Sequence, residues 1–329
     1  MKKLIIGFAT IVALVLCGVF ILAKKDSPKS TRVVLQLKWI YNSGFAGDLV
    51  ASEKGFWKEL GLDVEVRAGG VGTAPIKVVT TGDAQFGVAT GDQLLLAIEE
   101  GTPVTAIALA YEDNPLAWIT RSESGIKSAK DFKGKKIGLS FIDDEPLFNA
   151  MMARVGLDPK KDLQVVPVKF DTSPFLRGEV DAFPVYRNTQ GIELAAELSK
   201  QGVQTHIVGV ADEKLVSYSN LYFATKDFET KHPDVVRSFI AGVLKGWSYA
   251  QDHPDEAAEI VAKYDKENKL EIIKQSVRAT NKLVKPEASS QIGKMTLEGW
   301  QSTQQILLEA KQMKKTLDLN TAFVGSYVQ

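Results

Sequence analysis

The sequence has 329 residues with 40 basic and 40 acidic side chains, so its formal charge at pH 7 is zero and gives no electrostatic reason to expect nucleic-acid binding. Cys17 is the single cysteine, which excludes an internal disulfide and leaves no thiol after the N-terminal segment for a zinc site or a nucleophile. The roughly 300 residues that follow this segment exceed the usual size of one hydrophobic core, so we expect two lobes.

The N-terminal segment has the features of an export signal. Residues 4–23 contain no charged side chain and have lysines on both sides, which is typical of a signal peptide or an N-terminal membrane anchor. We assign residues 1–31 to this leader and expect the rest of the chain to work outside the cytoplasm. The apolar run is close to the length that spans a bilayer, so retention and cleavage both stay open. Lipidation at Cys17 is a further alternative, although Leu16 stands where a small residue usually precedes a lipidated cysteine.

The segment after the leader predicts an α/β lobe. Apolar and polar residues alternate from Leu62 to Ala68, which is typical of a half-buried strand, and the neighbouring segments alternate between strand and helix patterns. In chain order we predict a strand at 33–39, a helix after it, a strand at 62–68, a helix near 75–81, a strand at 84–90, a helix with Asp92 as its N-cap and a strand at 103–111.

A second set of the same kind follows and predicts a second α/β lobe. Its elements are a strand at 135–140, a helix at 146–155, a strand at 163–169, a helix from Pro174, a strand at 180–186 and a helix at 192–201. After this lobe no further strand is predicted apart from a short apolar one near Tyr222. Amphipathic helices that wrap the first lobe are expected at 234–252, 254–264, 270–283 and 289–315.

Two short apolar strands, near Trp118 and Tyr222, are the predicted crossings between the lobes. We therefore assign residues 32–118 and 224–329 to the first lobe and residues 119–223 to the second. A ligand is expected between the lobes, where strand ends and helix N-termini converge.

Six segments carry a resemblance to a known family, at 35–47, 51–66, 81–108, 126–139, 178–194 and 232–261. In order and spacing, over residues 33–310, the chain resembles substrate-binding proteins of ABC importers, in the branch that handles thiamine-pyrimidine precursors, riboflavin, sulfonates and nitrate. The resemblance implies a two-lobed type II periplasmic-binding fold of the α/β class with a hinge between its lobes. It also implies that the lobes close over a small ligand and deliver it to a membrane permease with its ATPase, without a cofactor or a metal.

Aromatic residues next to asparagines favour a flat ligand. Trp39 and Tyr186 could stack on such a ligand, while Asn42 and Asn188 could bond its edge. For Trp39 the alternative is packing against the core beside its strand. As the resemblance implies, aminopyrimidine binders of this branch have an acidic residue where this chain has Gln190. An amide offers a donor and an acceptor and suits a lactam or imide edge, so a riboflavin-like flavin and a modified pyrimidine are the leading ligands.

Further candidates lie at strand ends and crossings. Gly70 belongs to a glycine-rich turn whose N–H groups could bind a ligand oxygen, although a tight turn explains it equally well. The remaining candidates for ligand contact are Phe45, Thr90, Tyr111, Asn114 and Tyr218, and for Tyr218 packing in the hinge is the alternative. An acidic cluster at 143–145 could suggest a metal site, but a solvated loop is the interpretation we favour.

The same residues bear on three further function classes. As the resemblance implies, a pyrimidine-synthesising enzyme of this fold would use a histidine and a cysteine-rich metal motif. The three histidines, His206, His232 and His253, stand away from the aromatic segments. A membrane-anchored ligand sensor and a binding protein for sulfonate-like or nitrate-like anions also stay open. We expect a non-enzymatic binding protein.

Overall fold

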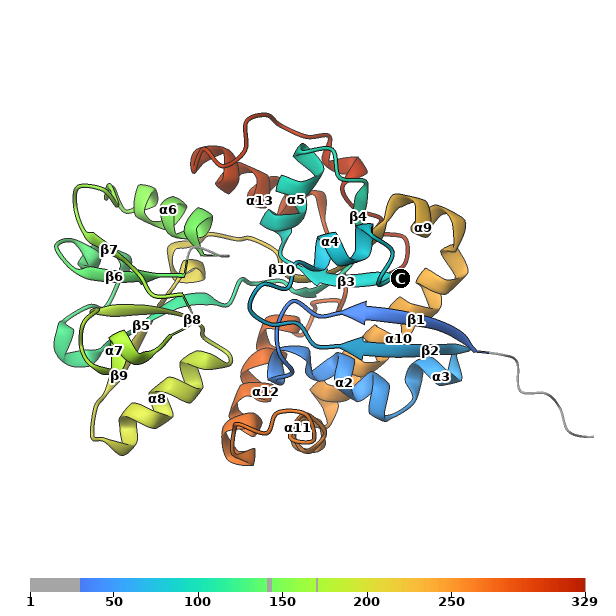
Figure 1. Ribbon diagram of the computed structural model, residues 1–329, viewed down its shortest axis with the longest axis horizontal. Helices are drawn as coiled ribbons and strands as arrows, with labels where there is room; N and C mark the ends of the chain where they lie inside the picture. The colour runs from blue at the N-terminus through green and yellow to red at the C-terminus, as the bar shows by residue number, and fades with distance from the viewer. Residues whose placement is uncertain (1–29, 141–143, 170, 329) are drawn as a thin grey trace, which may run out of the picture.

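The computed structural model describes residues 30–140, 144–169 and 171–328, and these form two α/β lobes, each built on a five-stranded sheet (Figure 1). The predicted leader lies outside the described residues except for its last two positions. The strands of the first sheet are β1 (Thr31–Gln36), β2 (Leu62–Arg67), β3 (Phe86–Ala89), β4 (Val104–Tyr111) and β10 (Ser219–Thr225). Those of the second are β5 (Leu116–Arg121), β6 (Lys136–Leu139), β7 (Gln164–Pro167), β8 (Ala182–Tyr186) and β9 (Thr205–Gly209).

The two sheets share one pattern of strand directions. The first has the order β2-β1-β3-β10-β4, with β1 parallel to β2 and β3, and β10 antiparallel to β3 and β4. The second has the order β7-β6-β8-β5-β9, with β6 parallel to β7 and β8, and β5 antiparallel to β8 and β9. This arrangement of two mixed sheets confirms the predicted α/β class.

Helices cover both faces of each sheet. In the first lobe they are α2 (Ala46–Glu53), α3 (Phe56–Glu59), α4 (Pro75–Thr80), α5 (Gly91–Glu99), α9 (Lys226–Lys231), α10 (Pro233–Asp252), α11 (Pro254–Val261) and α12 (Leu270–Val284). The second lobe has α6 (Glu145–Arg154), α7 (Ser173–Leu176) and α8 (Gln190–Lys200), and the last helix is α13 (Leu297–Glu309). Within the described residues, none of these helices combines the length and the apolar character needed to cross a membrane.

The predicted crossing strands each belong wholly to one sheet. Trp118 lies in β5 and pairs with Pro184 and Val208 of the second sheet, whereas Tyr222 lies in β10 and pairs with Val88 of the first. The chain therefore passes between the sheets just before these strands, at residues 112–115 and 210–218.

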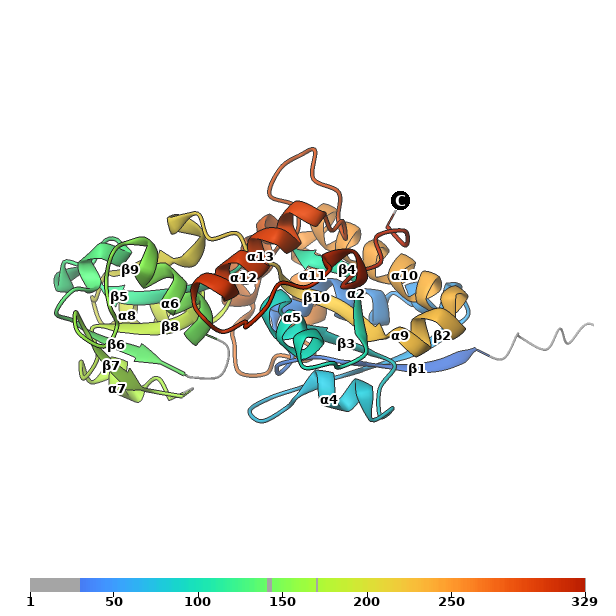
Figure 2. The same cartoon turned by 90° about the horizontal axis from the view of Figure 1, so that it is seen from above.

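The last helix differs from the prediction. A helix at 289–315 was expected to wrap the first lobe, but α13 begins only after Thr296, whose side chain accepts a hydrogen bond from the N–H of Gly299. Gly293, with a φ of +92°, interrupts the chain before it. Trp300 packs in a core of the first lobe, while Ile306 packs in a core of the second. Figure 2 shows α13 beside the junction of the lobes, so it bridges them instead of wrapping one.

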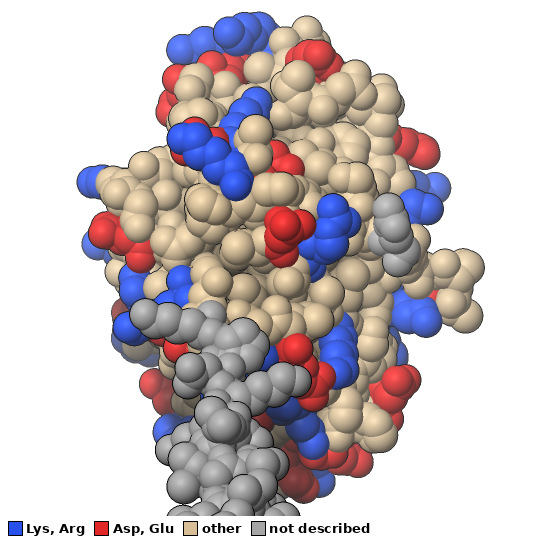
Figure 3. All heavy atoms as spheres, turned by 90° about the vertical axis from the view of Figure 1, so that its right-hand side faces the viewer, with Lys and Arg blue, Asp and Glu red and all other residues tan. Residues whose placement is uncertain are grey.

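The outer end of the first lobe carries both signs of charge. Figure 3 shows basic and acidic side chains interspersed over this face. Arg32 of β1 and Glu65 of β2, for example, form an exposed ion pair of 3.1 Å. Such pairs contribute little to stability, and the mixture gives this face no large field of one sign.

Candidate ligand-binding site

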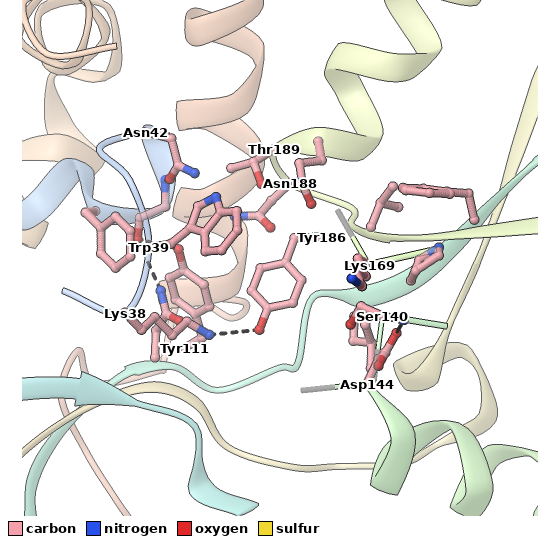
Figure 4. Close-up of a pocket in the computed structure, with 18 residues that line it drawn as sticks. Lys38, Trp39, Asn42, Tyr111, Ser140, Asp144, Lys169, Tyr186, Asn188 and Thr189 are labelled. Atoms are coloured by element: carbon pink, nitrogen blue, oxygen red, sulfur yellow. Dashed lines mark hydrogen bonds between the residues drawn. The ribbon is translucent and has the colours of Figure 1, made fainter. Parts of the chain in front are cut away.

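A cavity lies between the lobes, at the ends of their central strands. The segment after β1 supplies Lys38, Trp39 and Asn42 from the first lobe, and the segment after β8 supplies Asn188, Thr189 and Gln190 from the second. The other lining residues are Gly44, Phe45, Tyr111, Leu116, Ser140, Asp144, Lys169, Phe183, Pro184, Val185, Tyr186 and Asn220. Figure 4 shows the polar and aromatic members converging from both sides.

Aromatic rings from both lobes line this cavity. Trp39 and Tyr186 are half-buried and lie near one another in Figure 4, and Phe45 and Tyr111 are buried behind them. Trp39 also packs against the core of the first lobe. The two interpretations of Trp39 given by the sequence therefore describe one position, at the edge of the core and on the wall of the cavity. Faces of this kind suit a flat apolar ring.

A direct contact joins the two aromatic segments across the lobes. The Nζ atom of Lys38 donates a hydrogen bond of 2.8 Å to the hydroxyl of Tyr186. The same ammonium lies 4.7 Å from the centre of the Tyr186 ring. Because Lys38 follows β1 and Tyr186 ends β8, this contact forms only when the lobes are together.

The wall of the first lobe is held by a short hydrogen-bond network. The Oδ1 atom of Asn42 accepts from the N–H of Gly44 at 2.8 Å and caps the 3-10 turn Ser43–Phe45. The carbonyl of Gly44 accepts from the Tyr111 hydroxyl at 2.6 Å and from Nδ2 of Asn220 at 3.3 Å. Burial raises the pKa of Tyr111, so its hydroxyl stays a neutral donor. The amide nitrogen of Asn42 can donate to a ligand.

Asn188 joins the wall of the second lobe to the first. It is 2% exposed, and its Nδ2 atom donates a hydrogen bond of 2.8 Å to Oγ1 of Thr280 in α12. Gln190 lies two residues further on, at the first position of α8. Of the predicted ligand contacts, the structure thus brings together Trp39, Asn42, Phe45, Tyr111, Tyr186, Asn188 and Gln190.

Four other candidates do not line the cavity. Gly70 lies in the turn after β2, where its carbonyl accepts a hydrogen bond of 3.0 Å from the N–H of Thr73. Thr90 has an extended backbone and is the N-cap of α5. Asp92 was predicted to be this cap, but it lies in the first turn of the helix. Asn114 accepts from the N–H of Leu116 and shapes the first crossing. These positions have local structural roles.

Tyr218 is the fourth of these candidates, and it packs at the hinge as the alternative interpretation held. Its ring lies 5.4 Å from that of Trp300, and the Thr296 N–H donates to its hydroxyl at 2.9 Å. The tyrosine thus fixes the start of α13 against the second crossing. This position gives it no contact with the cavity.

Sequence reasoning missed several polar or charged lining residues. Ser140 ends the predicted strand at 135–140, and Lys169 ends the one at 163–169, so strand-end position was a usable signal for both. Lys38 directly precedes Trp39, and Thr189 directly follows Asn188. Asn220 gave a weaker signal, because it lies inside the strand near Tyr222 and its φ of +51° is visible only in the structure.

The acidic cluster at 143–145 also differs from the prediction. Asp144 is 2% exposed and lines the cavity, where its carboxylate accepts from the Ser140 N–H at 2.7 Å. It is therefore not part of a solvated loop, while Asp143 lies outside the described residues. In the part of the chain that the structure describes, no three acidic, histidine or cysteine side chains gather in a way that could hold a metal ion.

The histidines lie elsewhere on the molecule. His206 is exposed on β9 and contacts the carbonyl of Lys127, whereas His232 and His253 stand at helix ends beside aromatic rings. None of the three is among the residues that line the cavity. A proton-transfer role at this cavity would therefore need a group other than histidine.

Two lobes with this strand order and a cavity between them define the periplasmic-binding-protein fold. The solved periplasmic aliphatic sulphonate binding protein SsuA of Escherichia coli superposes with a TM-score of 0.70 at 15% identity, over 90% of this chain and 92% of that one. The profile of the family described as NMT1/THI5 like matches residues 42–257. The chain belongs to the NMT1/THI5-like family.

The sequence is similar both to a binding protein and to an enzyme. The riboflavin-binding protein RibY of Chloroflexus aurantiacus is 24% identical over 93% of this chain and 88% of its own length. A 4-amino-5-hydroxymethyl-2-methylpyrimidine phosphate synthase of Legionella pneumophila is 25% identical over 71% of this chain and 74% of its own. Family membership thus gives a substrate-binding architecture and leaves the ligand to be argued from the cavity.

Proposed function

We propose that this protein captures a small neutral heteroaromatic molecule between its lobes and delivers it to the permease of an ABC importer. The observation that carries the proposal is the pair of aromatic residues from opposite lobes, Trp39 and Tyr186, on the wall of one cavity. Apolar neighbours such as Leu116 and Phe183 surround them, and a few fixed amides lie at the edge. A cavity of mainly apolar character with a few placed polar groups suits such a ligand.

Closure of the lobes is the proposed means of capture. The lobes turn about the two connecting segments, 112–115 and 210–218, and a ligand that touches both walls favours the closed arrangement. The Lys38–Tyr186 and Asn188–Thr280 hydrogen bonds join the lobes in the structure, so they belong to this arrangement. With these segments as the hinge, β1–β4 and β10 move with the first lobe and β5–β9 with the second.

Delivery and location follow from the relatives and the leader together. The solved neighbour is named as periplasmic, and the leader at residues 1–31 is expected to direct export, so we place the mature protein outside the cytoplasm. We propose binding without catalysis, because the cavity wall offers no histidine to move a proton. A pyrimidine synthase would need such a group, and a membrane-anchored sensor would need a signalling partner.

An anionic ligand is the competing proposal, because Lys38 and Lys169 line the cavity. Two features oppose it. The ammonium of Lys38 already bonds the Tyr186 hydroxyl, and the buried carboxyl of Asp144 lies on the same wall. The carboxyl of Asp144 therefore offsets part of the positive charge that would attract an anion, and most of the remaining wall offers carbon to a neutral ring.

Two measurements test the proposal. Native mass spectrometry of protein purified without refolding should show a retained neutral aromatic molecule. Calorimetry with riboflavin, 4-amino-5-hydroxymethyl-2-methylpyrimidine, an alkanesulfonate and nitrate should show binding of at least one heteroaromatic probe. Binding of the two anions alone would refute the proposal.

Trp39→Ala should weaken binding of the heteroaromatic probe by more than about 1 kcal/mol, the scale of an aromatic contact. Ile40→Ala is the matched control, because Ile40 is the next residue, is 43% exposed and does not line the cavity. Unchanged affinity in a folded Trp39→Ala protein would remove the stacking role.

A further inference from the structure

We propose that Arg187 is a positioning residue, which holds the cavity segment of the second lobe against both connecting segments between the lobes. The inference rests on the proposed function, because it concerns how the same cavity is assembled. Arg187 directly follows β8, and its neighbours at 186 and 188–190 line the cavity. Arg187 itself is not among the lining residues. Any part that it has in binding must therefore act through these neighbours.

The backbone of Arg187 is bonded to the first connecting segment. Its N–H donates a hydrogen bond of 2.9 Å to the carbonyl of Pro115, the last residue of the segment 112–115. This bond extends the pairing of β8 with β5, in which Tyr186 lies opposite Leu116. The point where the chain enters the second lobe is thus joined directly to the cavity segment.

The side chain of Arg187 is bonded to the second connecting segment. Nη2 of the guanidinium donates a hydrogen bond of 2.7 Å to Oδ2 of Asp212, in the 3-10 turn Val210–Glu213. The same carboxylate oxygen accepts from the N–H of Gly209 at 2.7 Å. One residue therefore bonds the cavity segment to both connecting segments.

The second connecting segment passes from one lobe to the other after the Asp212 turn. Leu215 packs in a core of the second lobe, whereas Tyr218 packs in a core of the first. The bonds of Arg187 thus lie within the second lobe and are kept when the lobes move apart. We infer that Arg187 makes the cavity segment and the adjoining ends of both connecting segments one unit, which turns as a whole.

The guanidinium occupies a place that only glycine leaves open. A Cβ atom on Gly209 would lie 2.3 Å from Nη2 and 2.7 Å from Cζ of Arg187, which are the two nearest atoms. The backbone of Gly209 has a φ of −103° and a ψ of 154°, an extended conformation that any residue adopts. The close approach of the guanidinium, and not backbone strain, therefore accounts for glycine at this position.

The pair of Arg187 and Asp212 is too exposed to contribute much to stability. The two side chains are 31% and 48% exposed, and ion pairs of this kind add little to the free energy of unfolding. Its effect should lie in placement, because a binding site weakens when its side chains shift by a fraction of an ångström. Tyr186 and Asn188 bond across the gap to Lys38 and Thr280. Arg187 sets where these two side chains meet the first lobe.

Calorimetry on the full chain with riboflavin and 4-amino-5-hydroxymethyl-2-methylpyrimidine tests the inference. Arg187→Ala should weaken binding of whichever probe the unaltered protein binds by about fivefold, a size typical of residues that act without touching the ligand. The Tm should fall by less than about 4 °C, because an exposed pair is lost. Arg187→Lys keeps a cationic donor for Asp212, so its affinity should stay within about twofold of the unaltered value.

Gly209→Ala is a second test that leaves both members of the pair in place. Its new Cβ displaces the guanidinium, so we expect the same loss of about fivefold. Combined with Arg187→Ala it should cause no further loss, because the two changes remove one interaction. Losses that multiply in the double variant would contradict the shared cause.

Hydrogen exchange without ligand gives a readout that does not depend on the probe. In Arg187→Ala the amides of residues 186–190 should exchange at least about threefold faster than in the unaltered protein. Those of residues 194–200, further along α8, should exchange at the unaltered rate. This difference would separate a loosened segment from a general loss of stability.

Arg177→Ala is the matched control, because it removes an exposed ion pair with Glu179 in the same lobe, and neither residue lines the cavity. It should leave the affinity unchanged. Unchanged affinity in a folded Arg187→Ala protein, or an equal loss in Arg177→Ala, would overturn the inference and leave the proposed function standing. If neither probe binds while an alkanesulfonate does, the proposed function fails. Exchange rates of 186–190 then decide the inference, and unchanged rates would overturn it.

Discussion

The two lobes have the same sheet and different surroundings. In each sheet four strands run in one direction, and the fourth position is taken by one antiparallel strand that enters from the other lobe, β10 in the first sheet and β5 in the second. The helices α2–α5 and α9–α12 surround the sheet of the first lobe, whereas α6–α8 surround that of the second, and α13 packs against both lobes. The sheets are thus alike and the helical layers are not.

This difference extends to the cavity. The side chains of the first lobe's wall are held within that lobe, whereas those of the second lobe's wall bond to the first lobe. In the first lobe Asn42, Tyr111 and Asn220 converge on Gly44 and are bonded within their own lobe. In the second, the side chains of Tyr186 and Asn188 bond to Lys38 and Thr280 across the gap. We infer that the first lobe holds its part of the site before closure and the second lobe acquires its contacts on closing.

The largest expected effect concerns helix packing in the first lobe. A Cβ atom on Gly246 of α10 would lie 2.1 Å from the carbonyl oxygen of Gly47 in α2, a backbone atom that cannot move aside. Gly246→Ala should therefore lower the free energy of unfolding of this lobe by about 3 kcal/mol, despite the better helix propensity of alanine. Hydrogen exchange should show the loss in amides of β1 and β3.

Gly191→Ala in α8 of the second lobe is the matched variant. Its new Cβ would meet the end of the Ile207 side chain at 3.1 Å, which can shift. We expect a change below about 1 kcal/mol. Equal destabilisation by the two variants would contradict the contrast between a backbone clash at Gly246 in the first lobe and a side-chain contact at Gly191 in the second.

The next effect is a pH dependence confined to the first lobe. Asp48 of α2 is fully buried and accepts from the Tyr222 hydroxyl at 2.7 Å, and Trp247 donates to the same hydroxyl. Burial raises the pKa of Asp48 from 3.8 to about 7. The folded state therefore keeps a proton that the unfolded state releases, so the stability from this group is full below pH 4, falls as the pH rises to 7 and then stays level.

Asp48→Asn should remove this slope, because the amide oxygen still accepts from Tyr222 and carries no charge. At pH 8 we expect the variant to be more stable than the unaltered protein by about 2–4 kcal/mol, with little difference at pH 4. Denaturant unfolding at both pH values measures this. Asp63→Asn, an exposed change on β2, should leave the slope in place, and a slope that persists in Asp48→Asn would exclude Asp48 as its cause.

Strands and helices with a strong burial pattern could be predicted from the sequence. The strand at 62–68 corresponds to β2 and the helix at 234–252 to α10, because alternating and helical apolar periods survive folding. The strand β9 was missed, since it is short and its first residues, Thr205 and His206, are polar. The end of the chain failed for a different reason: an N-cap at Thr296 starts α13 late, and capping depends on one local residue.

The site was predictable where it follows strands along the chain. Trp39, Asn42 and Asn188 each lie just after a strand end, which the alternation of elements already located. Asn220 depends on β10 entering the first sheet from the far side, and this long-range pairing leaves no pattern in the local sequence. Gly70 and Thr90 also follow strands, yet neither lines the cavity, since Gly70 lies in a turn and Thr90 caps α5.

The smallest expected effect tests the closing of the second lobe directly. Glu193 of α8 lies near the 262–269 turn of the first lobe. Burial and the charge of Asp265 raise its pKa to about 7, with a smaller contribution of the same sign from Glu267 and an opposing one from Asn268. If opening separates α8 from this turn, the pKa returns towards 4.5, so closing takes up a proton. Affinity for the heteroaromatic probe should then be highest below pH 4.5, fall up to pH 7 and remain constant above it.

Glu193→Gln should abolish this pH dependence and raise the affinity at pH 7.5 by roughly tenfold, a value reduced from the full shift because the side chain is partly exposed. Calorimetry with the same probe between pH 5 and 8 gives both quantities. Glu197→Gln, an exposed change one turn further along α8, should reproduce the unaltered pH profile. A flat profile in the unaltered protein would mean that Glu193 has the same surroundings in the open and closed forms, and the second lobe would then no longer be the wall that is completed on closing.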